Sequence, residues 1–120
     1  MRRSVCLKRA YERPDLSDGM RVLVDRVWPR RASREDLKID LWLKEVAPST
    51  ALRKWFGHGP EKWEEMGTRY RRELGSGSQK EAFERLKSLY QKGRMTLVYG
   101  AKDEQHNQAV ILKELLEDRS

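Results

Sequence analysis

The sequence predicts an α/β fold: a single compact domain over residues 1–120, with a small, mostly parallel sheet and helices on both faces. Short apolar and β-branched runs alternate along the chain with longer segments in which apolar residues recur every three or four positions. Strands interleaved with helices favour parallel pairing, because a parallel return needs a crossover connection. A chain of 120 residues has room for one such domain and one modest core.

The first quarter of the chain contains two expected strands. Residues 4–8 alternate in the manner of a strand, and Cys6 is expected to point from it into the core. Residues 14–19 are rich in turn formers and too few for an ordinary crossover helix. Residues 21–24 form the second expected strand, which is buried and closes at Asp25.

Helix signals and one further strand occupy the next segment. Ser33 is expected to cap a short helical turn, with Asp36 three residues later. Residues 41–43 resemble another short strand. Ser49 opens a helix that ends at Gly57. The apolar positions of this helix are Ala51, Leu52, Trp55 and Phe56.

Two longer helices follow. The first is expected to begin at Pro60, because proline suits a first helical position. Its expected buried side chains are Trp63, Met66, Tyr70 and Leu74. Ser78 and Glu81 have the spacing of a capping box for the second helix, which ends at Gly93. Its expected buried side chains are Ala82, Phe83, Leu86, Leu89 and Tyr90.

The last expected strand is the most informative part of the chain. Residues 95–99 are apolar, β-branched and aromatic, and a helix is expected over residues 109–116. Asp103 suits the N-cap of that helix, which would place His106 at its third position. Small and ionisable residues between a strand's carboxyl end and a helix are where open α/β sheets bind ligands.

Two loops are therefore expected to meet at the carboxyl edge of the sheet and to share one polar pocket. The candidates for proton exchange are Asp25, Asp103 and His106. The candidates for holding and orienting an anionic substrate are Arg26, Arg30, Arg53, Lys102 and Asn107. Two structural alternatives remain open: Asp25 and Arg26 can form a structural ion pair, and Asp103 can simply cap the helix.

The net positive charge is concentrated in the first half of the chain. The formal net charge is +7, and residues 1–60 hold 14 Lys and Arg against 8 Asp and Glu. Such a field favours an anionic partner. The preferred hypothesis is a pocket for a small anionic ligand or nucleotide, with acid–base chemistry on a phosphate-bearing molecule. The alternatives are a nucleic-acid-binding or accessory module without catalysis, and a purely structural partner protein.

Several other classes of protein are not expected. No apolar run approaches the ~20 residues that span a bilayer, and the basic amino end lacks the apolar stretch of a secretory signal. A cytoplasmic location without membrane contact is therefore expected. The chain lacks glycine-rich phosphate loops, so no cofactor is expected. No metal is expected, because the two histidines lack clustered partner ligands.

Four ordered segments resemble the YeaO-like family of small bacterial and archaeal proteins, a domain of unknown function. The segments are DGMRVLVDRVWPR (18–30), LWLKEVAPS (41–49), LRKWFGH (52–58) and YGAKDEQHN (99–107). The resemblance covers about residues 4 to 117 and implies a compact α/β domain. Wider relatives carry a Cys-His-Arg triplet near the position of residues 105–107, where this chain has Gln-His-Asn. A thiol-dependent role would therefore lack its cysteine here.

Overall fold

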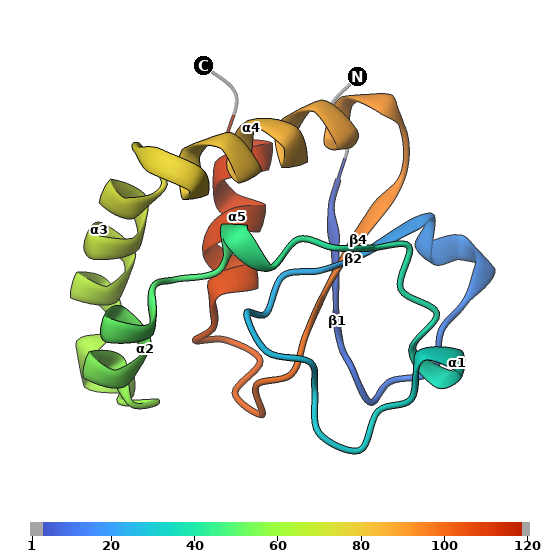
Figure 1. Cartoon of the computed structure of the whole chain (residues 1–120), viewed down its shortest axis with the longest axis horizontal. Coiled ribbons are helices and arrows are strands. Elements are labelled where there is room, and N and C mark those ends of the chain that lie inside the picture. The colour runs from blue at the N-terminus through green and yellow to red at the C-terminus, as the bar shows by residue number, and fades with distance from the viewer. Residues whose placement is uncertain (1–3, 119–120) are drawn as a thin grey trace.

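The computed structural model describes residues 4–118, and a four-stranded, fully parallel sheet lies at its centre (Figure 1). The strands are β1 (Cys6–Arg9), β2 (Met20–Leu23), β3 (Leu41–Trp42) and β4 (Met95–Tyr99). Their order across the sheet is β1-β4-β2-β3, so the last strand in the chain lies between the first two. All five residues of β4 are buried, as expected of a central parallel strand.

Within residues 4–118, five α-helices cover the sheet unevenly. They are α1 (Arg34–Leu37), α2 (Thr50–Phe56), α3 (Trp63–Glu73), α4 (Gly77–Lys92) and α5 (Gln108–Glu117). Helix α5 packs on β1 and β4, whereas the four-residue α1 packs on the opposite face of the sheet. The predicted α/β fold, with a parallel sheet and helices on both faces, is confirmed. None of the helices within residues 4–118 has the length and apolar character needed to cross a bilayer.

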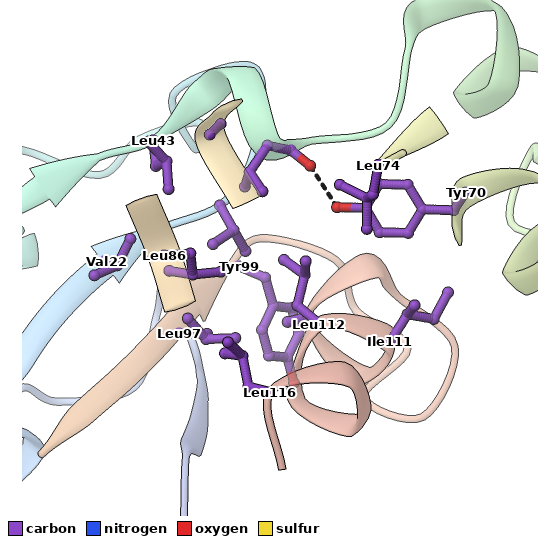
Figure 2. Close-up of a cluster of buried hydrophobic side chains, with 14 of the residues drawn as sticks. Val22, Leu43, Tyr70, Leu74, Leu86, Leu97, Tyr99, Ile111, Leu112 and Leu116 are labelled. Atoms are coloured by element: carbon purple, nitrogen blue, oxygen red, sulfur yellow. Dashed lines mark hydrogen bonds between the residues drawn. The ribbon is translucent and has the colours of Figure 1, made fainter. Parts of the chain in front are cut away.

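The larger core fills the first face of the sheet, which carries Leu97 and Tyr99 of β4. Figure 2 shows these side chains beside Leu112 of α5. Tyr70 of α3 is also buried in this core, and its hydroxyl donates a hydrogen bond to the main-chain carbonyl of Val46. The bond fastens α3 to the segment that precedes α2, so both helices are held against the same face.

A smaller core covers the second face of the sheet. Leu23 and Val98 point to this face and pack with Leu37 of α1. Because α1 is only four residues long, the loop before it completes the cover with Trp28. The Trp28 ring meets the Trp42 ring edge to face, with the ring centroids 5.4 Å apart.

A buried ion-pair network also lies on the second face. Asp18 and Arg21 are only 5% and 4% exposed. Asp18 Oδ2 lies 2.6 Å from Arg21 Nη1, and Asp18 Oδ1 lies 2.9 Å from Lys8 Nζ. The Thr96 hydroxyl donates to the Asp18 carbonyl over 2.8 Å. The network therefore ties the connection between β1 and β2 to the middle of the sheet.

Local sequence signals located several helix ends correctly. Ser33 and Ser49 are N-caps, and their hydroxyls accept hydrogen bonds from the N–H groups of Asp36 and Leu52. Gly57 ends α2 in the left-handed conformation, with φ of 52°. These ends were predictable because capping depends on residues that are close in the sequence.

The prediction that Cys6 points into the core is wrong. Val5 and Leu7 belong to the first-face core, and successive side chains of a strand point to opposite faces. Cys6 is therefore turned to the second face, where it is exposed.

Two predicted helix starts are also shifted. Pro60 begins a short 3-10 turn, and α3 starts only at Trp63. Ser76 is the N-cap of α4, so the Ser78 and Glu81 pair lies inside the first turns of the helix. The predicted capping box is absent for that reason, since a capping box needs its serine at the N-cap.

Candidate functional site

The loops after β2 and β4 meet at the carboxyl edge of the sheet. These strands are parallel neighbours, but the chain leaves β2 toward α1 on the second face and leaves β4 toward α5 on the first. Such a divergence opens a crevice in which α/β proteins bind ligands. Asp25 bridges the two loops. Its Oδ2 accepts the Gly100 N–H over 2.9 Å, and its Oδ1 accepts from Gln108 Nε2 over 2.6 Å.

The surroundings of Asp25 favour its protonated form relative to a carboxyl group in water. Burial raises the pKa of Asp25, although the Gly100 N–H, the Gln108 amide and the positive charge of Arg53 oppose the shift. Glycine at position 100 permits this approach, because a Cβ there would lie 2.9 Å from Asp25 Oδ2. The site therefore contains a half-buried carboxyl group that is held by Gly100 of the loop after β4 and by Gln108 at the start of α5.

A cavity of about 230 Å³ opens beside Asp25, between α2, α3 and the loop that leads into α5. Its polar lining residues are Thr50, Arg53, Lys54, His58, His106, Asn107 and Gln108. Its apolar lining residues are Pro48, Phe56, Met66 and Ala101. None of these lining residues carries a carboxylate. Within residues 4–118, no group of three or more His, Cys, Asp or Glu side chains is arranged to hold a metal ion.

His106 forms one wall of the cavity, and two contacts hold its ring. Its Nδ1 lies 2.8 Å from Asp103 Oδ2. The Trp63 ring meets the His106 ring edge to face, with the ring centroids 5.2 Å apart. The hydrogen bond with His106 and the main-chain N–H of Gln105 lower the pKa of Asp103. An ionised carboxylate can only accept, so the His106 Nδ1 donates this hydrogen bond to Asp103.

The predicted helical roles of Asp103 and His106 are wrong. The N-cap of α5 is Asn107, whose Oδ1 accepts from the N–H groups of Ala109 and Val110 over 2.9 and 3.3 Å. His106 therefore precedes the helix. Asp103 instead folds the loop, since its Oδ1 accepts the main-chain N–H groups of two following residues.

The predicted site residues occupy three kinds of position. Those in the cavity lining are Arg53, His106 and Asn107. Those directly behind the lining are Asp25, which contacts Gln108, and Asp103, which contacts His106. Those outside the lining are Arg26, Arg30 and Lys102. Arg30 and Lys102 are exposed at the surface.

Arg26 has a structural position. Its guanidinium donates to the main-chain carbonyl of Ala47 over 2.8 Å and to that of Pro48 over 3.2 Å. These bonds hold the segment that enters α2. Among the described contacts Arg26 does not pair with Asp25, so the structural ion pair considered from the sequence is not formed.

Of the polar lining residues on α2 and in the turn that follows it, sequence reasoning found Arg53 and missed Thr50, Lys54 and His58. Thr50, Arg53 and Lys54 have i, i+3, i+4 spacing and therefore share one helix face. That spacing was the signal that could have found them as a group. His58 follows Gly57, and both adopt positive φ, 59° and 52°. Positive φ is uncommon for histidine, and this turn brings His58 back to the cavity.

Comparisons with known proteins relate almost the whole chain to bacterial relatives. A family model described as "Inactive DUF488-N3 subclade" matches residues 4–120. The Escherichia coli protein named "Uncharacterized protein YeaO" is 39% identical over 109 residues, which are 91% of this chain and 93% of that protein. "Uncharacterized protein Rv3073c" of Mycobacterium tuberculosis is 37% identical over 115 residues, 96% and 95% of the two chains. No solved structure matches the chain. The YeaO-like resemblance of the four segments is confirmed.

Proposed function

Because the chain belongs to the family described as "Inactive DUF488-N3 subclade", we propose that its cavity binds a small phosphate-bearing anion without transforming it. One observation carries the proposal. The lining contains an arginine, a lysine and two histidines but no carboxylate. A concave surface with charge of one sign concentrates ligands of the opposite sign.

Arg53 is the main expected anion contact. A guanidinium presents a planar fork of donors that fits a phosphate with two parallel hydrogen bonds. Lys54 adds a second positive charge on the same face of α2. His58 and His106 supply ring nitrogens from two other segments. The anion would therefore be contacted from several sides, which favours a specific site over diffuse attraction.

The contact between Asp103 and His106 favours proton transfer as a second candidate function. A histidine that lines a cavity and is oriented by a carboxylate has the arrangement of a general base. The family description speaks against turnover. This chain also lacks the cysteine that the wider relatives carry near residues 105–107. Binding is therefore the function that the cavity supports best.

Nucleic-acid binding by the basic surface is the remaining alternative. Arg30, Arg31 and Lys102 are exposed outside the cavity. A protein that binds through such residues loses affinity steeply as salt is added, because counterions are released from the phosphate backbone. A small anion in a cavity depends less on salt, since it contacts only a few cations.

The substitution Arg53→Ala tests the proposed function. It removes charge-assisted hydrogen bonds, each of which contributes about 1.5–3 kcal/mol, so the Kd for inorganic phosphate is expected to rise at least ~10-fold. Calorimetric titration at fixed ionic strength measures the change. Arg53 is exposed, so the free energy of unfolding is expected to stay within about 0.5 kcal/mol of wild type.

Arg85→Ala is the matched control, because Arg85 is an exposed arginine of α4 outside the cavity lining. It removes the same net charge and is expected to leave the phosphate Kd unchanged. Equal losses in the two variants, or no phosphate binding by the wild type, would contradict the proposal. Tight, strongly salt-dependent binding of DNA or RNA in place of phosphate would support the alternative.

A further inference from the structure

We infer that the ligand of the cavity is an aromatic phosphate monoester, with its phosphate at the α2 rim and its ring on the apolar floor. The inference rests on the proposed function and adds the chemical class of the ligand. The cationic and the apolar lining residues lie in different parts of the cavity. A bare phosphate ion would contact only the cationic ones.

The floor of the cavity is mainly apolar and continuous with the core, although the buried Asn107 also lies in it, with its amide bonded to the Asp103 carbonyl and the Ala109 N–H. Phe56 and Met66 are only 7% and 3% exposed, yet both line the cavity. The little surface they expose therefore belongs to its base. Both residues are members of the first-face core. Ala101 continues this apolar surface from the loop after β4.

The rim of the cavity is polar and cationic. Four exposed lining residues lie on α2 or in the turn that follows it: Thr50, Arg53, Lys54 and His58. Positive charge is therefore at the entrance, and apolar surface is at the base. A ligand that matches both must carry its negative charge at one end and an apolar group at the other.

The cavity is larger than a phosphate ion alone would fill. A cavity needs only about 10–15 Å³ to hold one water molecule, and this one has about 230 Å³. A lone phosphate at the rim would leave apolar floor in contact with water. Covering that floor removes apolar surface from water, which favours a ligand with an apolar part.

Aromatic side chains around the cavity favour a ring over an alkyl chain. Phe56 packs against Trp63 with ring centroids 6.0 Å apart, and Trp63 in turn supports the His106 ring. His106 is also held by Asp103, so the ring that forms this wall is fixed in orientation. Aromatic groups pair edge to face or in offset stacks with gains beyond the area they bury.

The test compares three probes by calorimetric titration of the full chain at fixed ionic strength: inorganic phosphate, methyl phosphate and phenyl phosphate. Phenyl phosphate is expected to bind at least ~10-fold more tightly than methyl phosphate. Arg53→Ala is expected to weaken all three probes by a similar factor. Ala101→Leu fills the base of the cavity without changing its charge. It is expected to abolish the preference for phenyl phosphate while inorganic phosphate still binds.

Phe56→Leu provides a second variant that keeps the core apolar, and it is expected to reduce the same preference. Thermal unfolding of each variant verifies that it folds. If phosphate binds through Arg53 but phenyl phosphate binds no more tightly than methyl phosphate, the inference is overturned and the proposed function stands. A phenyl preference that survives both Ala101→Leu and Phe56→Leu also overturns the inference. If none of the probes binds, both the inference and the proposed function are wrong.

Discussion

Asp18→Ala is expected to lower the free energy of unfolding by about 3–5 kcal/mol, because it leaves a buried charge without its partner. Arg21 is 4% exposed, and its Nη1 lies 2.6 Å from Asp18 Oδ2. Lys8 loses its ion pair as well. The Asp18 carboxylate also accepts the Asp15 N–H, so the turn before β2 is loosened too.

The pH dependence of unfolding provides an independent measurement of the same interaction. Burial of Asp18 opposes its ionisation, but hydrogen bonds from Lys8, Asp15 and Arg21 outweigh burial, and the pKa of Asp18 is lowered below 3.8. A group whose pKa is lower in the folded state stabilises the fold at pH values above its unfolded-state pKa. This contribution is lost as the pH falls through the folded-state pKa. In urea unfolding across this pH range, the free energy of unfolding is therefore expected to fall more steeply with decreasing pH in the wild type than in Asp18→Ala.

Asp36→Ala is the control for this prediction. Asp36 is an exposed acidic residue in the first turn of α1, and its loss is expected to change the free energy of unfolding by no more than about 0.5 kcal/mol. If Asp18→Ala and Asp36→Ala were equally mild, the ion-pair network would not stabilise the fold as described.

Gly19→Ala is expected to cost at least ~3 kcal/mol of unfolding free energy, for two separate reasons. Gly19 has φ of 67° and ψ of −141°, a region that side chains with a Cβ avoid. A Cβ at this position would also lie 2.3 Å from the carbonyl oxygen of Arg94. That oxygen accepts the Met20 N–H at the start of the pairing between β2 and β4, so it cannot move without loss of pairing.

Gly77→Ala separates the two reasons. Gly77 has nearly the same φ, 66°, but a Cβ added at this residue would have no neighbouring atom within 4 Å. The Gly77→Ala substitution is therefore expected to incur only the conformational cost, which lowers the free energy of unfolding by about 1–2 kcal/mol. Chemical unfolding of both variants gives the difference. Equal losses for Gly19→Ala and Gly77→Ala would mean that the approach to Arg94 has no energetic role.

Features set by neighbours in the sequence were the predictable part of the fold. Met95–Tyr99 was predicted as a buried strand because its apolar, β-branched composition fits both faces of a central strand. Ser33 and Ser49 were predicted as caps because a hydroxyl reaches an N–H group two or three residues later. The parallel arrangement followed from the alternation of strands and helices.

Features that depend on distant contacts were not predictable in the same way. Asp103 and Asn107 are both good N-cap residues, and the sequence alone does not choose between them. In the fold, Asp103 is engaged by His106, so Asn107 is left to cap α5. The ion pair of Asp18 with Arg21 was missed because burial of that turn depends on how the β1–β2 connection crosses the sheet.

The candidate site was predictable in its location but only partly in its membership. The carboxyl ends of β2 and β4 indicated where the loops would meet, and Asp25 does contact Gly100 there. The direction of a side chain after a strand end does not follow from the sequence. Arg26 therefore turned out to bind main-chain carbonyls. α2 supplies residues to the cavity lining because the long connection between β3 and β4 brings it, and His58 after it, beside the loop that leads into α5.

The most direct test of the proposed anion site is a titration of the isotopically labelled protein with inorganic phosphate, followed by amide NMR shifts. Binding in the cavity predicts saturable shifts confined to residues 48–58, to the segment around Met66 and to residues 100–108, which line it. Shifts spread over the exposed arginines at positions 13, 30, 31 and 34, or no saturable shift at all, would contradict the account.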